Sequence, residues 1–193
     1  MNTPNKLTIA RIIATPFFMA ALMIEFPYHY TAALILFAAA SLTDMIDGKL
    51  ARKYNQITDF GKFLDPLADK MLTTAAFLGF IKMGIGWQVT WIAFIVLFRE
   101  FLVSSLRLVT VSSGGKVIAA NMWGKCKTVS QMAGIIFALF AYALISDFGI
   151  GGAAFAGVCN IIISVLFWIS AVLCIISGAI YLISGKEYID PAK

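Results

Sequence analysis

The sequence has few of the residues that most often bind metals through nitrogen or sulfur. Its 193 residues include one histidine, His29, and three cysteines, Cys126, Cys159 and Cys174. The cysteines are odd in number and have no ligand spacing, which argues against a disulfide framework and a cysteine-rich zinc site. We interpret the cysteines as free thiols, and His29, in a Pro-Tyr-His-Tyr turn, as a residue that binds no metal.

Charged residues are also scarce. They make up 13% of the chain, against about 25% in ordinary soluble domains. Hydrophobic residues make up 61%, and several apolar runs reach the ~20 residues needed to cross hydrocarbon. This composition excludes an ordinary soluble enzyme and predicts an integral membrane protein. The net charge of +5 is small, and we expect membrane lipids, but no nucleic acid, as partners.

The apolar runs predict an all-α membrane protein with six transmembrane helices in a single domain, residues 1–193. The expected spans are residues 7–24, 31–50, 59–83, 88–109, 125–145 and 155–183. Of the lysines and arginines, all but Lys82 and Arg99 fall near one side of these spans. Because positive residues favour the cytoplasmic side, we expect both termini in the cytoplasm.

Acidic residues concentrate between positions 44 and 69. Five aspartates lie there, and four of them have helical spacing between apolar segments: Asp44, Asp47, Asp65 and Asp69. A carboxylate near hydrocarbon costs roughly 2.5–3.5 kcal/mol, so a cation must offset the charge of this group. Oxygen ligands without histidine or cysteine favour Mg²⁺ or Mn²⁺ over zinc. We predict two divalent ions bound between two helices, in an active site that faces the cytoplasm.

Small residues and one arginine are interleaved with these acids. Gly48, Ala51 and Arg52 share one helical arc with the first two aspartates, and Gly61 precedes the third by one turn. Small side chains let a flat ligand approach the helix backbone, and arginine suits a phosphate. The combination predicts a site for a substrate that carries a diphosphate.

Other interpretations of the acids remain open at this point. A solvated, charged rim of a helix pair would explain a lone pair of acids, but not eight positions in one register. An ion- or proton-coupled transporter would also use intramembrane carboxylates, but it needs neither the arginine nor the small residues. A membrane prenyltransferase uses aspartate-rich helices with Mg²⁺ and diphosphate, although we expect it to have more spans and acidic motifs farther apart.

The run from Asp44 to Asp69 resembles the signature of the CDP-alcohol phosphotransferases. It reads D-x-x-D-G-x-x-A-R, eight residues, then G-x-x-x-D-x-x-x-D, with no position missing. Three further stretches look like those of the bacterial phosphatidylglycerophosphate synthases, a branch of this family: Pro4 to Arg11, Arg99-Glu100 and Gly124 to Thr128. The resemblance covers essentially the whole chain and implies a six-helix membrane enzyme, usually a homodimer.

The resemblance also implies a reaction in phospholipid biosynthesis at the bacterial cell membrane. The donor would be CDP-diacylglycerol, the acceptor sn-glycerol 3-phosphate, and the products phosphatidylglycerophosphate and CMP. The four aspartates would bind two Mg²⁺ or Mn²⁺ ions, and Asp69 would act as the base. The CDP pocket would comprise Gly48, Ala51, Arg52 and Gly61. A related enzyme with serine, inositol phosphate or phosphatidylglycerol as acceptor remains an alternative.

An acceptor that carries a phosphate needs further cations. Arg107, Lys125 and Lys127 lie at the cytoplasmic ends of the fourth and fifth expected spans, and we predict that they bind this phosphate. Arg99 lies inside a span, where we expect it to pair with Glu100 or with another carboxylate of the bundle.

Overall fold

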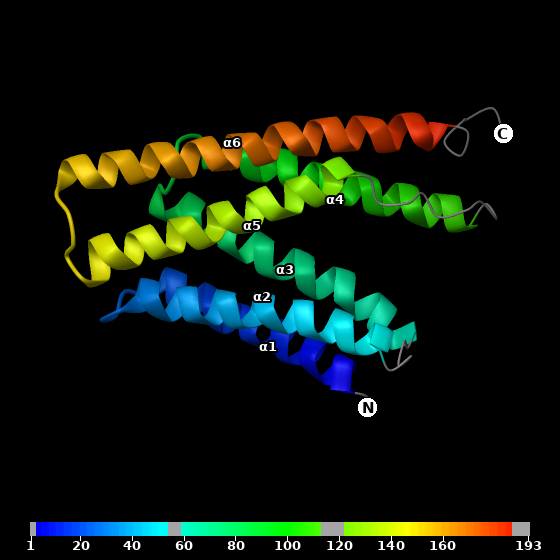
Figure 1. The fold of residues 1–193 in the computed structure, drawn as a ribbon, viewed down its shortest axis with the longest axis horizontal. Helices are drawn as coiled ribbons and strands as arrows, with labels where there is room; N and C mark the ends of the chain where they lie inside the picture. The colour runs from blue at the N-terminus through cyan, green and yellow to red at the C-terminus, as the bar shows by residue number, and fades with distance from the viewer. Residues whose placement is uncertain (1–2, 54–58, 113–121, 187–193) are drawn as a thin grey trace.

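The described residues form six α-helices and one short π-helix, with no strand among them, in this computed structural model (Figure 1). The structure describes residues 3–53, 59–112 and 122–186, and the side chains of residues 5–44, 61, 64–110 and 122–186. The helices are α1 (Thr3–Met23), α2 (His29–Lys53), α3 (Asp59–Met83), α4 (Val89–Ser112), α5 (Met122–Tyr142), η1 (Ala143–Asp147) and α6 (Ala153–Ser184). The expected all-α class is confirmed.

Each expected span corresponds to one helix, and α5 differs from its expected span in helix type as well as in its bounds. This helix begins at Met122 rather than at Lys125, and its last turn widens into the π-helix η1. The amide of Phe148 there donates to the carbonyl of Ala143, five positions back, at 3.2 Å. The sequence pattern does not signal this change, because the same apolar residues suit both kinds of helix.

The six helices pack as two groups of three (Figure 1). In the first half, α1 packs against α2 and α3; in the second half, α6 packs against α4 and α5. Contacts of α2 with α5 and of α3 with α4 join the halves. We call the end of the bundle where α2 ends, at Lys53, and α3 begins, at Asp59, the motif end. Helix α1 begins and helix α6 ends toward this end (Figure 1).

Aromatic rings fill the contact between the two halves. The ring centroid of Phe167 in α6 lies 5.3 Å from that of Phe77 and 5.7 Å from that of Phe80, both in α3. Gly134 of α5 gives Phe167 its space, since a Cβ at this position would lie 2.8 Å from the ring. Because lipid is itself apolar, we attribute the cohesion of the halves to such close packing rather than to removal from water.

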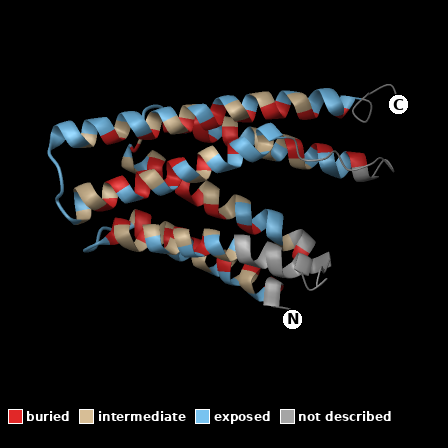
Figure 2. Cartoon of the chain, in the orientation of Figure 1, coloured by how far each residue is buried: buried red, intermediate tan, exposed pale blue. Residues whose placement is uncertain are grey.

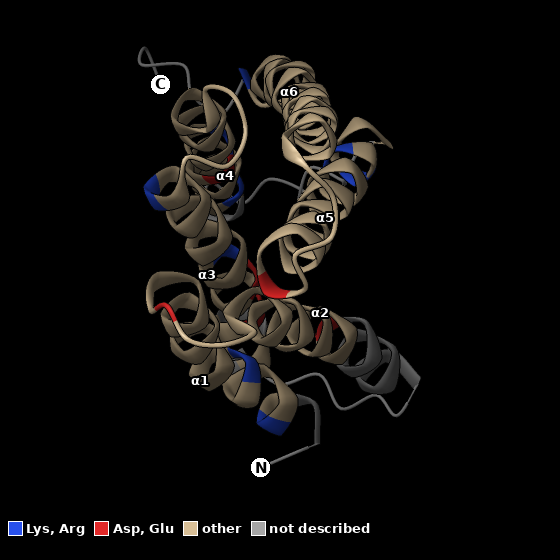
Figure 3. Ribbon diagram, turned by 90° about the vertical axis from the view of Figure 1, so that its left-hand side faces the viewer, with Lys and Arg blue, Asp and Glu red and all other residues tan. Residues whose placement is uncertain are grey.

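The outer faces of the helices are apolar. Figure 2 shows exposed residues along the outer sides of the helices, and Figure 3 shows uncharged residues over most of the bundle. Large exposed rings such as Phe94, Phe98 and Phe101 of α4 suit lipid and not water. Three described helices are long and apolar enough to cross a membrane: Asn5–Met23, Met122–Asp147 and Ala153–Ser184. The helices α2, α3 and α4 each contain charged residues.

Turns and caps fix the end of the bundle opposite the motif end. Gly84 and Gly86 have φ values of 67° and 87° in the α3–α4 turn, a backbone region that favours glycine. Asp147 Oδ2 accepts hydrogen bonds from the amide and the hydroxyl of Thr31, at 2.6 and 2.7 Å. This aspartate therefore has a structural partner far from the motif.

Candidate active site

The first half carries the described acids of the motif at its motif end. Asp44, late in α2, has half of its side chain exposed, whereas the side chain of Arg11 in α1 is 1% exposed. Arg11 Nη1 donates to Asp44 Oδ1 at 2.5 Å. A buried guanidinium needs a paired carboxylate to offset its desolvation. Helix α1 therefore supplies a fixed counter-charge to the motif, which the sequence analysis did not predict.

Thr8 makes a second contact from α1 to the motif. Its hydroxyl donates to Asp65 Oδ1 of α3 at 2.7 Å. Thr8 is buried and Asp65 is exposed. Thr8 and Arg11 are three residues apart and share one face of α1. This face of α1 therefore contacts one acid on each of the two motif helices.

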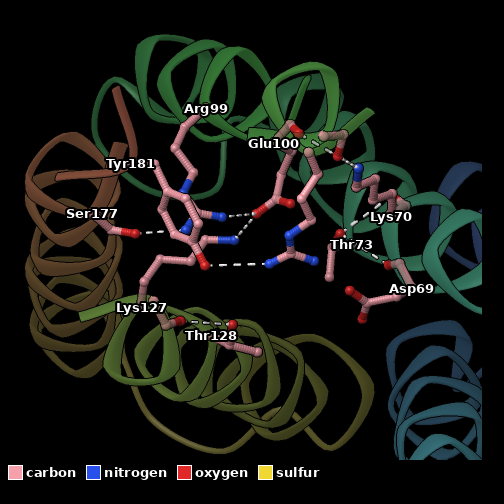
Figure 4. Close-up of polar contacts among 12 residues, drawn as sticks. Asp69, Lys70, Thr73, Arg99, Glu100, Lys127, Thr128, Ser177 and Tyr181 are labelled. Carbon is pink, nitrogen blue, oxygen red and sulfur yellow. Dashed lines mark hydrogen bonds and ion pairs between the residues drawn. The ribbon is translucent and has the colours of Figure 1, made fainter. Parts of the chain in front are cut away.

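Asp69 lies between the two halves. It follows Asp65 by one turn of α3, and Figure 4 shows its carboxylate across from the polar side chains of α4, α5 and α6. It is within electrostatic range of Asp44 and Arg11 in the first half, and of Glu100 and Lys127 in the second. A group in this position can act on a ligand that contacts both halves.

Several predicted site residues fall on α2 beyond Asp44. The side chains of Asp47, Gly48, Ala51 and Arg52 lie outside the described residues. Gly61 is described, and it is buried near the start of α3. The structure thus places three of the predicted acids at one end of the bundle, while the CDP pocket stays a prediction.

The second half carries cations around one carboxylate, that of Glu100 in α4 (Figure 4). Lys127 of α5 is 5% exposed and donates through Nζ to Glu100 Oε1. Arg99 Nη1 donates to the same oxygen at 3.3 Å, the pairing that the sequence analysis expected. Arg99 Nη2 donates to the Ser177 hydroxyl of α6 at 2.5 Å. These bonds link all three helices of the second half.

Lys70 connects this cluster to α3. Its Nζ donates to the Ser104 hydroxyl and to the Glu100 backbone carbonyl, the latter at 3.5 Å. We define the cation group as Lys70, Arg99, Glu100, Arg107 and Lys127. With four positive residues and one negative residue, the group has a surplus of positive charge, which suits an anionic ligand.

Tyr181 of α6 lies between two arginines of the cation group. Arg107 Nη2 donates to the Tyr181 hydroxyl at 3.3 Å. The guanidinium carbons of Arg99 and Arg107 lie 5.7 and 5.9 Å from the ring centroid, within the range of a cation–π contact. The sequence analysis missed Tyr181 and Ser177. Their only signal is two hydroxyls one turn apart on the same face of an apolar helix.

The three predicted acceptor-binding cations differ in their surroundings. Arg107 and Lys127 belong to the cation group, and Lys127 is paired with Glu100, a partner that the sequence analysis did not assign. Lys125 is exposed on α5. The structure therefore brings two of these three residues to one cluster between α4 and α6.

The donor atoms of the described acids fit a hard divalent ion. Asp44, Asp65 and Asp69 offer only carboxylate oxygens, which Mg²⁺ and Mn²⁺ prefer and zinc does not require. Asp44 and Asp65 each accept their hydrogen bond from α1 through Oδ1. Within the described side chains, no three potential ligands lie close enough together to hold an ion. The fourth acid, Asp47, is not among those side chains.

Sequence similarity to known proteins decides the family. The sequence model of the CDP-alcohol phosphatidyltransferase family matches residues 1–176. The chain belongs to this family. The match includes every acid of the motif and every member of the cation group. It ends at residue 176, so it includes neither Ser177 nor Tyr181.

Several relatives of this CDP-alcohol phosphatidyltransferase share one name, CDP-diacylglycerol–glycerol-3-phosphate 3-phosphatidyltransferase. The Bacillus subtilis (strain 168) protein is 42% identical over 146 residues, which are 69% of this chain and 74% of the relative. The Rickettsia bellii protein is 38% identical over 191 residues, 97% of each chain. The Escherichia coli (strain K12) protein is 34% identical over 186 residues, 96% of this chain and 95% of the relative.

Proposed function

We propose that this phosphatidyltransferase transfers the phosphatidyl group of CDP-diacylglycerol to sn-glycerol 3-phosphate, with phosphatidylglycerophosphate and CMP as products. The observation that carries the proposal is the pairing of two opposite charge clusters in one bundle. The acids of the first half suit a metal-bound diphosphate, and the cation group, four of whose five members lie in the second half, suits the phosphate of the acceptor. Curated relatives that match nearly the whole chain are named for this reaction.

We assign the donor substrate, CDP-diacylglycerol, to the first half of the bundle. Four acids would hold two Mg²⁺ or Mn²⁺ ions against its diphosphate: Asp44, Asp47, Asp65 and Asp69. Four further positions would form the CDP pocket: Gly48, Ala51, Arg52 and Gly61. The bound ions would neutralise charge on the transferred phosphorus and on the leaving group. Arg11 and Thr8 would hold the carboxylates of two of the acids in a fixed orientation through the hydrogen bonds described above.

We assign the acceptor substrate, glycerol 3-phosphate, to the second half of the bundle. Arg107, Lys125 and Lys127 would bind its phosphate, and Asp69 would accept the proton of its attacking hydroxyl. The hydroxyl oxygen then bonds to the phosphorus of the phosphatidyl group, and the bond from this phosphorus to the phosphate of CMP breaks. The position of Asp69 between the two charge clusters supports its role as the base.

We assign the protein to the bacterial cell membrane with all six helices spanning it, and we expect a homodimer. The three strongly apolar helices support a membrane location. The helices that carry acids or cations would line the active site, where charged side chains face one another and not lipid. Because the lysines and arginines concentrate at the motif end, the positive-inside rule favours cytoplasmic termini and a cytoplasmic active site.

The test is a reaction with purified protein in detergent, CDP-diacylglycerol, Mg²⁺ and labelled glycerol 3-phosphate. We expect label in the lipid fraction and release of CMP in equal amounts. EDTA should abolish both, and Mg²⁺ or Mn²⁺ should restore them.

Two other results would change the proposal. CMP release only with serine, inositol phosphate or phosphatidylglycerol would keep the family and change the acceptor. Folded protein that releases no CMP with any acceptor would contradict the enzyme assignment. Substrate movement across a membrane without CMP formation would then favour a transporter.

A further inference from the structure

We infer that Tyr181 is a positioning residue that holds Arg107 in place for the phosphate of the acceptor, and so helps to select a phosphorylated acceptor. The inference rests on the proposed function and extends it to α6. Its basis is the hydrogen bond and the ring contact between these two side chains.

Tyr181 is buried among its neighbours. It is 3% exposed and forms a small hydrophobic cluster with Val103 and Leu106 of α4, which are 5% and 7% exposed. These two residues lie in the turns of α4 that lead to Arg107. The same segment of α4 therefore packs against the ring and carries the arginine that the ring contacts.

Arg107 is exposed and has a long side chain. An exposed arginine samples many rotamers and loses this freedom when it binds a ligand. Its contacts with the hydroxyl and the ring of Tyr181 restrict these rotamers before any ligand arrives. A preorganised guanidinium binds phosphate with a smaller entropic cost and in a defined bidentate geometry.

The two arginines on Tyr181 differ in their remaining partners. Arg99 donates to Glu100 and to Ser177, so it serves to join the helices of the second half. Arg107, among the described residues, donates a hydrogen bond to Tyr181 alone. A guanidinium has five N–H donors, so Arg107 keeps donors for a phosphate. This contrast identifies Arg107 as the arginine that Tyr181 orients toward a ligand.

The decisive variant is Tyr181→Phe, which removes the hydroxyl and keeps the ring. We expect the KM for glycerol 3-phosphate to rise about 5-fold, with kcat and the KM for CDP-diacylglycerol unchanged. Tyr181→Leu also removes the cation–π contact and should lower kcat/KM for the acceptor by about 30-fold. The matched control is Tyr142→Phe, because Tyr142 donates to Asn160 at 3.1 Å near the opposite end of the bundle. This control should keep wild-type kinetics.

Inorganic phosphate provides a second readout that a merely structural role would not move. We expect Tyr181→Phe to weaken competitive inhibition by phosphate by the same factor as it raises the KM for the acceptor. If Tyr181→Phe lowers thermal stability, the double variant with Arg107→Lys decides between the roles. A positioning role predicts that Tyr181→Phe has little further effect on this KM once Arg107 is replaced, whereas a structural role predicts additive effects.

Two outcomes would overturn the inference in distinguishable ways. If the wild-type protein is active, but Tyr181→Phe changes neither the KM for glycerol 3-phosphate nor the inhibition by phosphate, the inference alone is overturned. Equal changes in the KM of both substrates in Tyr181→Phe would also overturn it. Wild-type protein that does not carry out the reaction would overturn the proposed function, and the inference with it.

Discussion

The two halves of the bundle differ in how far the carboxylate of their ion pair is exposed. In the first half the acid is accessible and its partner is buried: the side chain of Asp44 is half exposed, and that of Arg11 is 1% exposed. In the second half both partners are enclosed: the side chain of Glu100 is 19% exposed and that of Lys127 is 6% exposed. The accessible acids suit ligands that arrive and leave, whereas the enclosed pair of Glu100 and Lys127 holds a cation that is already in place.

Because of this difference, we expect substitutions in the two halves to have different effects. A buried cation that loses its counter-charge destabilises the fold as well as the site, because its desolvation is no longer offset. An exposed carboxylate that loses one hydrogen-bond donor stays hydrated by water. It therefore loses mainly its fixed orientation. The largest effects should therefore come from the shared carboxylate of the cation group, and the smallest from single hydrogen bonds to the acids.

Replacing Glu100 by Gln should have the largest effect of the supporting residues. It removes the carboxylate that Lys127 and Arg99 share, so we expect a loss of about 3 kcal/mol of stability and a fall of at least about 30-fold in kcat/KM for the acceptor. Thermal unfolding in detergent and steady-state kinetics measure the two effects. The double variant Glu100→Gln/Lys127→Met should regain stability without regaining acceptor binding. A stable, fully active Glu100→Gln protein would remove the distinction between the halves.

Replacing Arg11 by Gln should have an intermediate effect. The change removes the buried charge that orients Asp44, and we expect about 10-fold lower turnover, with a shifted Mg²⁺ dependence. Arg11→Lys keeps the charge and should retain more activity than Arg11→Gln. CMP release over a series of Mg²⁺ concentrations compares the three proteins. Equal activity of the two variants would show that charge at this position is irrelevant.

Replacing Thr8 by Val should have the smallest effect. It removes one hydrogen bond to Asp65 while it keeps the side-chain shape, so turnover should fall about 5-fold. The matched control is Thr15→Val, because the Thr15 hydroxyl donates to the Arg11 backbone carbonyl at 2.9 Å and not to a motif acid. Initial rates of CMP release should distinguish the two variants. Equal rates would mean that the Thr8 contact does not orient Asp65 for the reaction.

The sequence is informative wherever function depends on local spacing. The motif acids lie on two consecutive helices, and the bounds of α3 agree with the expected span at both ends. Apolar runs of helical length likewise predicted all six helices. These features depend on residues within a few turns of one another, and periodicity reports such features directly.

Contacts between distant segments were not predictable in the same way. Arg11 and Asp44 are 33 positions apart, and Arg99 and Ser177 are 78 positions apart. Helix packing decides such pairs, and a single sequence carries no record of it. For the same reason the sequence predicts Lys127 as a ligand of the acceptor phosphate but does not predict its partner Glu100. Tyr181 escaped notice because an aromatic residue in an apolar helix resembles ordinary packing.

In the proposed function, the acids at the motif end and the cation group form one site for phosphatidyl transfer. The most direct test compares Asp69→Asn with Asp147→Asn, the same chemical change at opposite ends of the bundle. We predict that Asp69→Asn lowers CMP release from CDP-diacylglycerol and glycerol 3-phosphate by about 10²–10⁴-fold, the usual contribution of a general base. Asp147→Asn should remain close to wild type. Comparable rates in the two variants, with both proteins folded, would contradict the account.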